Sequence, residues 1–292
     1  MTIIAATPTS FLGLDPWLAF RCIAKAGIVN VEVPALPMPQ AIDWGQTTFA
    51  PELLGADGGR RLRDRIVELG LVPITVGAYT NIREEAQVEP LLRRIDLADA
   101  LGASFVIVDA AGPETATTDE WRRIGIRGRY VGEYAADRNV RLAFEIHEGL
   151  AHSGAAARRL VEAIDHAAIG INYDTGNAIY YNDGIDPVDD IESVLDRLFH
   201  MHVKDTSGGR GDWAFGPLGS GRVDLPTVLS KALATGFEGP FSLEIEGLAG
   251  EDLTRAQLVE RVGASRAYLV GIVGEAGPNS APAARRVAAG HG

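Results

Sequence analysis

The sequence predicts a single-domain α/β protein, a (β/α)₈ TIM barrel. Short apolar runs rich in β-branched residues alternate with helical patterns, and eight such runs occur along the chain. The chain has 292 residues, and one barrel of this kind uses about 250 residues. A doubly wound open sheet is the second candidate, but no glycine-rich dinucleotide fingerprint follows the first run.

The predicted strands are continuous apolar segments, which is typical of parallel strands that are covered on both faces. Each is short enough for a strand, and a helical pattern follows it. The eight predicted strands are Ile3–Ala6, Ile28–Val33, Val72–Ala78, Phe105–Asp109, Arg141–His147, Ile169–Asp174, His200–Lys204 and Phe241–Glu246.

The segments between these runs have apolar residues at helical spacing, with charged residues between them. Gly70, Gly102 and Gly236 each follow such a pattern, so we expect them to end helices before the next strand. The clearest helical patterns are Glu84–Leu101, Asp189–Leu198 and Leu225–Ala234.

We expect the barrel to span residues 1–273 and the Gly-, Ala- and Pro-rich segment 274–292 to be a tail outside it. This tail is expected to be mobile or to lie on a neighbouring subunit. The sequence leaves open whether the protein forms a homo-oligomer or a hetero-oligomer.

Composition argues against several classes of partner. The net charge of -12 disfavours nucleic acid as a partner. Cys22 is the one cysteine, which excludes an intrachain disulfide, and we expect it to be buried. The N-terminus lacks the features of a signal peptide, and no run of about 18 apolar residues predicts a membrane span. These features predict a cytoplasmic enzyme.

The last four predicted strands end in carboxylates and histidines. Functional groups of a TIM barrel lie at the C-terminal ends of its strands. Buried carboxylates and histidines need a partner, and one divalent cation would serve all of them. Because side chains alternate along a strand, the residues that share a face are Glu145 with His147, Asn172 with Asp174, His200 with His202 and Lys204, and Glu244 with Glu246.

The predicted ligand set is therefore rich in oxygen, with three carboxylates and one imidazole. A single strand-end Glu is more often solvated or salt-bridged, and a lone His is more often structural. Four polar strand ends in succession favour the metal site. The set favours Mn²⁺, with Mg²⁺, Co²⁺ and Zn²⁺ as alternatives.

Several motifs in the second half resemble the xylose isomerase-like barrels of the sugar phosphate isomerase/epimerase superfamily. They occur in the order of that superfamily, whereas the first half is similar only in architecture. The motifs are FEIH at 144–147, YDTGN at 173–177, HMHVKD at 200–205, PLGSGRVD at 217–224 and SLEIE at 242–246.

This resemblance implies that Glu145, Asp174, His202 and Glu244 bind the metal, and that Glu145 and Glu244 also form the acid/base pair. The position where ketose epimerases of the family often have a substrate-contacting His is Asn177 here. This difference weakens the case for a simple free ketohexose as the substrate.

Other strand-end and loop residues are candidates for substrate binding, each with a structural role as the alternative. Arg210 lies in a glycine-rich loop from which it would reach a phosphate or carboxylate, and Trp44, Phe49 and Trp213 are candidates for stacking on a sugar ring. The candidates for substrate binding are His147, Asn177, Lys204, Arg210, Glu246, Glu32 and Asp109.

The first functional hypothesis is an isomerase or epimerase of a keto sugar or related polyol that moves a proton through a metal-bound enediolate. The alternative is a lyase of the same fold, either a cyclitol dehydratase or an enzyme eliminating from a 3-keto-glycoside. An apurinic endonuclease ranks lower, because it needs more histidines and a basic groove. A non-catalytic binding barrel ranks last, because all four predicted ligands are present.

Overall fold

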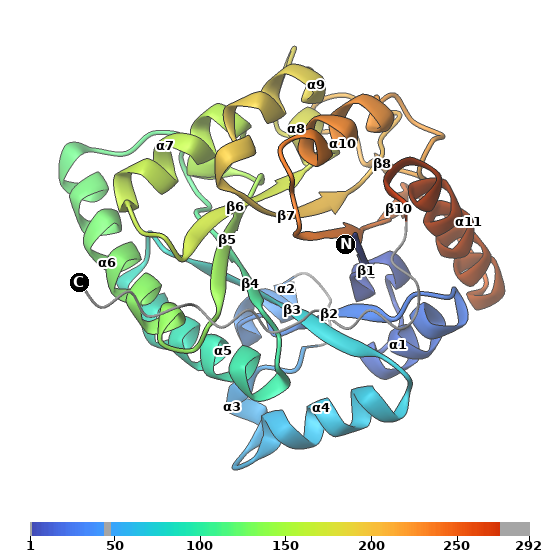
Figure 1. The fold of residues 1–292 in the computed structure, drawn as a ribbon, viewed down its shortest axis with the longest axis horizontal. Helices are drawn as coiled ribbons and strands as arrows, with labels where there is room; N and C mark the ends of the chain where they lie inside the picture. The colour runs from blue at the N-terminus through green and yellow to red at the C-terminus, as the bar shows by residue number, and fades with distance from the viewer. Residues whose placement is uncertain (1, 44–47, 275–292) are drawn as a thin grey trace.

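The computed structural model describes residues 2–43 and 48–274, which form a closed barrel of parallel strands (Figure 1). Each strand pairs with the next one along the chain, and β9 closes the barrel against β1. The fold prediction is therefore confirmed. The barrel strands are β1 (Ile3–Ala6), β2 (Asn30–Pro34), β3 (Val72–Asn81), β4 (Phe105–Asp109), β5 (Arg141–Glu145), β6 (Ile169–Asp174), β7 (Leu198–Val203) and β9 (Pro240–Leu243).

The longer helices follow one another around the outside of the barrel (Figure 1). The strands are buried on both faces, with β4 and β6 buried along their whole length. The core therefore lies inside the barrel and in the layer between strands and helices. The longer helices are α1 (Pro16–Lys25), α4 (Gly58–Glu68), α5 (Val88–Leu101), α6 (Thr118–Ala136), α7 (Gly154–Ile164), α10 (Leu225–Ala234) and α11 (Arg255–Val273).

Short polar residues begin most of these helices. Asp15 accepts hydrogen bonds from the backbone N–H groups of Trp17 and Leu18 at the start of α1. Thr254 and Gln257 form a capping box at the start of α11. Caps of this kind stabilise a helix by about 1 kcal/mol each.

The predicted helix ends at Gly70, Gly102 and Gly236 are confirmed. These glycines have φ values of +76°, +73° and +78°. In this left-handed region a side chain is strained, so glycine is the residue that ends a helix there at little cost.

The prediction of one helix over residues 189–198 is wrong. The chain forms α9 (Pro187–Asp190), then two 3₁₀ turns, and β7 begins at Leu198. The side chain of Ser193 donates a hydrogen bond to the Asp190 carbonyl, and the Asp190 carboxylate accepts one from the Gly154 N–H at the start of α7. Such side-chain bonds compete with a regular helix.

Shorter elements lie between the strands and the outer helices. The short helices are α2 (Met38–Asp43), α3 (Pro51–Leu54) and α8 (Asn177–Tyr180). Beyond the C-terminal ends of the barrel strands, β8 (Ala214–Phe215) pairs antiparallel with β10 (Gly247–Leu248). The 3₁₀ turn Pro8–Phe11 follows β1 at the same end.

Two predictions concern residues outside the described part of the chain. Apart from Gly274, the predicted tail lies there, and so does Trp44. Among the described residues, no helix has both the length and the apolar character needed to cross a membrane.

Candidate metal centre and active site

Four side chains converge at the C-terminal end of the barrel. Each of them offers a potential metal-binding atom that lies within 4.8 Å of those of the other three. Glu145 and Asp174 are the last residues of β5 and β6, His202 lies near the end of β7, and Glu244 directly follows β9. The strand register explains the convergence. Asp174 of β6 pairs with His202 of β7, and His202 pairs with Ser242 of β9, two residues before Glu244.

One oxygen of each carboxylate is held by the protein. The Oδ1 atom of Asp174 accepts hydrogen bonds from the backbone N–H groups of Gly176 and Asn177, at 2.9 and 2.8 Å. The Oε1 atom of Glu244 accepts one from the Thr9 hydroxyl at 2.9 Å. Glu145 Oε1 accepts a longer one, at 3.3 Å, from the amide of Asn177. These bonds fix the direction in which each carboxylate points.

The second oxygen of each carboxylate is buried and makes no hydrogen bond within the described part of the chain. These atoms are Oε2 of Glu145, Oδ2 of Asp174 and Oε2 of Glu244. Burying three carboxylate oxygens is costly unless positive charge compensates them. Lys204 Nζ forms ion pairs with those of Asp174 and Glu244, and a divalent cation would compensate all three together. Three carboxylate oxygens and one imidazole nitrogen are suitable ligands for Mn²⁺ or Mg²⁺. The residues present therefore fit a divalent metal ion.

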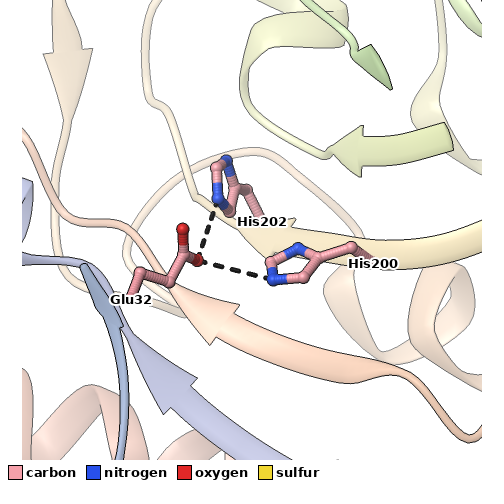
Figure 2. Close-up of side chains that lie close together, drawn as sticks. All are labelled: Glu32, His200 and His202. Carbon is pink, nitrogen blue, oxygen red and sulfur yellow. Dashed lines mark hydrogen bonds and ion pairs between the residues drawn. The ribbon is translucent and has the colours of Figure 1, made fainter. Parts of the chain in front are cut away.

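The imidazole of His202 has carboxylates on both sides of its ring. Its Nδ1 atom lies 3.1 Å from Glu145 Oε1 and 3.3 Å from Glu244 Oε2. Its Nε2 atom lies 3.0 Å from Glu32 Oε1 on the other side of the ring (Figure 2). Burial alone would lower the pKa of His202, but Glu244, Glu32 and Glu145 raise it well above its ordinary value. A metal ion at Nδ1 would therefore displace a proton.

The ammonium group of Lys204 reaches the same carboxylates. Its Nζ atom forms ion pairs with Asp174 Oδ2 at 3.1 Å, Glu244 Oε2 at 2.8 Å and Glu246 Oε2 at 2.9 Å. It also donates a hydrogen bond to Asn177 Oδ1 at 3.2 Å. Lys204 is only 3% exposed. A buried ammonium group thus faces the carboxylates where a substrate oxygen would approach them.

Burial and neighbouring charges separate the pKa values of the carboxyl groups. Burial raises the pKa of Asp174 to about 7, although Lys204 opposes the shift. Burial also acts to raise the pKa of Glu244, but Lys204 and His202 outweigh it and hold that pKa below its ordinary value. Glu244 therefore stays ionised over the neutral range, whereas Asp174 without a metal ion takes up a proton readily.

His147 and Asp109 lie together at the edge of this centre. His147 Nε2 is 2.8 Å from the Tyr181 hydroxyl, and His147 Nδ1 is 3.9 Å from Asp109 Oδ2. Burial raises the pKa of Asp109 to about 6, against the effect of His147. His147 is therefore held between a phenol and a carboxyl group, as a proton-transferring histidine would be.

The structure places the other predicted substrate contacts in three different settings. Asn177 is buried and connects Glu145 with Lys204, and Glu32 is buried against His202. Arg210 is half exposed and forms an ion pair with Asp183 at 3.1 Å. Arg210 lines a cavity of about 300 Å³ together with Tyr181 and His152, so it lies at the rim.

Several residues of the site have no clear signal in the sequence. Thr9 lies in the turn after β1, and Tyr181 lies one residue beyond α8. Tyr79 has a φ of +48° within an irregular part of β3, and its hydroxyl pKa is raised first by burial and then by Glu145 and Glu244. A strained non-glycine residue beside charged groups is a sign of function, but φ cannot be read from a sequence.

Comparison with known proteins places these observations in a family. The family model described as xylose isomerase-like TIM barrel matches residues 20–261. A 3-dehydroshikimate dehydratase of Pseudomonas putida is 26% identical over 248 residues, which is 77% of this chain and 35% of that protein. An inosose dehydratase of Clostridium botulinum is 24% identical over 194 residues, which is 56% of this chain and 64% of that protein. The alignments thus span less than two thirds of either relative.

A solved structure confirms the fold. A xylose isomerase-like TIM barrel protein from Mycobacterium smegmatis, in complex with magnesium, superposes with a TM-score of 0.70 at 20% sequence identity. The match covers 91% of this chain and 98% of that one.

Proposed function

Because the chain belongs to the xylose isomerase-like TIM barrel family, we propose that it is a divalent-metal-dependent lyase that removes water from a cyclic polyhydroxy ketone. The observation that carries the proposal is the convergence of three buried carboxylates and one imidazole nitrogen, whose potential ligand atoms all lie within 4.8 Å of one another. Such a centre suits chemistry in which negative charge develops on a substrate oxygen.

The substrate class follows from the relatives. One is named a 3-dehydroshikimate dehydratase and another an inosose dehydratase, and both names describe loss of water from a ring that carries a ketone and hydroxyl groups. These names favour the lyase over the isomerase or epimerase that the sequence motifs ranked first. The proposed substrate is therefore a small carbohydrate-like or cyclitol ketone.

The proposed metal ion is held by Glu145, Asp174, His202 and Glu244, and when bound it would supply positive charge beside the ketone and an adjacent hydroxyl group. The oxygen-rich ligand set supports Mn²⁺ first, with Mg²⁺, Co²⁺ and Zn²⁺ as alternatives. The Mycobacterium smegmatis protein of the same fold is in complex with magnesium, which supports a divalent ion as the bound group.

The residues of the chain supply the proton transfers. Glu145 is the proposed base, because no ion pair joins its carboxylate to Lys204 among the described residues, whereas Glu244 Oε2 is paired with Lys204. Glu145 takes the proton from the carbon next to the ketone, and the C–H electrons form a carbon–carbon double bond while the carbonyl oxygen gains negative charge. The ammonium group of Lys204 donates a hydrogen bond to that oxygen.

The second step expels the hydroxyl group. The ketone re-forms, the double bond shifts toward the carbon that carries the leaving group, and that carbon–oxygen bond breaks. His147 donates a proton to the departing oxygen, which leaves as water, and Tyr181 holds the ring of His147. His147 regains its proton from solvent, and Glu145 releases the one that it took.

The test is incubation of chelator-stripped protein with 3-dehydroshikimate and with an inosose, each with and without Mn²⁺. The proposal expects loss of water, seen as a conjugated product in the ultraviolet spectrum, only when the metal is present. A panel of ketoses in deuterated water is the parallel arm. Deuterium exchange or epimerisation of a ketose, with no elimination from either cyclic ketone, would overturn the lyase in favour of an epimerase.

A further inference from the structure

The metal-binding histidine has a carboxylate on each side. Nδ1 of His202 faces Glu145 and Glu244, whereas its Nε2 faces Glu32 at 3.0 Å (Figure 2). Glu32 comes from β2, on the other side of the barrel from β6, and it is 2% exposed. An ionised carboxylate can only accept a hydrogen bond. Nε2 of His202 therefore donates a hydrogen bond to Glu32 when it carries the ring proton.

The neighbouring His200 does not supply that proton. Its Nδ1 atom lies 2.8 Å from Asn172 Oδ1, and an amide oxygen only accepts, so the proton of a neutral ring belongs on Nδ1. Its Nε2 atom lies 3.2 Å from the Thr75 hydroxyl and 3.5 Å from Glu32 Oε1. Nε2 of His200 is then the acceptor of the Thr75 hydroxyl. Of the two histidines, His202 is thus the donor to Glu32.

We propose that Glu32 is a positioning residue that holds the single ring proton of metal-bound His202 on Nε2, so that Nδ1 is the nitrogen that binds the metal ion. This inference rests on the proposed metal centre. It gives Glu32 a role through His202 instead of the substrate contact expected from the sequence. Removing the carboxylate partner of a metal-binding histidine weakens metal binding by about 10- to 100-fold.

A second metal ion between Glu32, His200 and His202 is the competing interpretation, because their potential ligand atoms also lie within 4.8 Å of one another. That site would need a lone pair on Nε2 of His202. The same nitrogen cannot both donate a proton to Glu32 and bind a metal ion. Three carboxylates face Nδ1 of His202 and Glu32 faces Nε2, so the geometry favours one metal ion on the Nδ1 side and a positioning carboxylate on the other. The test separates the two interpretations.

The experiment is a titration of chelator-stripped protein with Mn²⁺, in which electron paramagnetic resonance counts the free ion. Wild type is compared with Glu32→Gln and with Glu52→Gln, a matched control whose carboxylate pairs with Arg94. We expect one ion per chain in all three proteins. The Kd should rise about 10- to 100-fold in Glu32→Gln and stay unchanged in Glu52→Gln. Circular dichroism and thermal melting check that each variant is folded.

The titration has three outcomes that would overturn either the positioning role of Glu32 or the proposed function. An unchanged Kd in folded Glu32→Gln would overturn the positioning role and leave the proposed function intact. Two ions bound to wild type, with one lost in Glu32→Gln, would overturn it in favour of the second metal site. Failure of wild type to bind any of Mn²⁺, Mg²⁺, Co²⁺ and Zn²⁺ would overturn the proposed function itself.

A second measurement does not depend on the variant folding. Long-range ¹H–¹⁵N spectra of the histidine rings, recorded on wild type loaded with diamagnetic Mg²⁺, report which ring nitrogen carries the proton. We expect the proton of His202 on Nε2. A proton on Nδ1 would overturn the proposal.

Discussion

The ammonium group of Lys204 lies 2.8 Å from Oε2 of Glu244, a proposed metal ligand, and forms a buried ion pair with it. The lysine therefore compensates negative charge at the centre, and it would also repel a cation placed among the same carboxylates. One side chain thus affects both the affinity for the metal ion and the charge available to the substrate.

Replacing Lys204 with methionine should separate these two effects. Lys204→Met keeps most of the length of the side chain and removes its charge, so we expect tighter Mn²⁺ binding because less positive charge opposes the ion. Turnover in the proposed elimination should fall by about 10²- to 10³-fold, because the developing oxyanion loses a donor. Metal titration and steady-state kinetics on the same sample check both effects. Weaker metal binding would contradict the assigned arrangement of charges.

Thr9 provides a test of how Glu244 is oriented. Its hydroxyl donates to Glu244 Oε1 at 2.9 Å, and Thr9→Val removes the donor while keeping the shape of the side chain. We expect the Kd for Mn²⁺ to rise by about tenfold, as for other outer hydrogen bonds to metal ligands. Thr227→Val is the matched control, because the hydroxyl of Thr227 in α10 donates to Asp224, the residue that precedes the helix. Equal affinities in both variants would show that Thr9 does not orient the ligand.

The hydrogen bond between Tyr181 and His147 predicts a role in turnover. Tyr181→Phe removes the hydroxyl 2.8 Å from His147 Nε2 and keeps the aromatic ring. We expect kcat to fall by about tenfold, because a misplaced proton donor loses part of the 10²- to 10⁴-fold effect of acid catalysis. The pH profile of kcat should also shift. Tyr180→Phe is the control, since Tyr180 contacts Trp213 and Phe215 through its ring. A kcat and a pH profile like those of wild type would show that the Tyr181 hydroxyl does not hold His147 for proton transfer.

The raised pKa of Asp109 predicts how the free energy of unfolding depends on pH. Its pKa is raised by burial from 3.8 to about 6, so the unfolded chain ionises this group before the folded chain does. Its contribution to stability is fully present below about pH 4 and is lost as the pH rises to about 6. At pH 7, Asp109→Asn should therefore raise the free energy of unfolding, by up to about 3 kcal/mol. Urea unfolding at pH 4 and pH 7 measures the difference, and an equal effect at both would contradict the assigned cause.

The barrel and the ends of its strands could be predicted from the sequence because they depend on local pattern. Buried parallel strands are continuous apolar runs, and alternation along β7 places His200, His202 and Lys204 on one face. The same reasoning failed for residues 189–198, where Ser193 and Asp190 make bonds that no periodicity reveals.

The partners inside the site depend on contacts between distant parts of the chain. The bond between Glu32 and His202 joins residues 170 positions apart, and that between Thr9 and Glu244 joins residues 235 positions apart. Register shifts after Val31 and Ile171 also change which side chains lie beside each other across strands. A sequence pattern within one strand contains no information about such shifts.

Glu145, Asp174, His202 and Glu244 form one divalent metal centre in the function proposed above. The most direct test is the metal content of wild type, Glu145→Gln and Glu244→Gln after the chelator-stripped proteins are equilibrated with Mn²⁺ and desalted. We expect one ion per wild-type chain and loss of the ion from both variants, with each variant still folded. Unchanged metal content in both variants would contradict it.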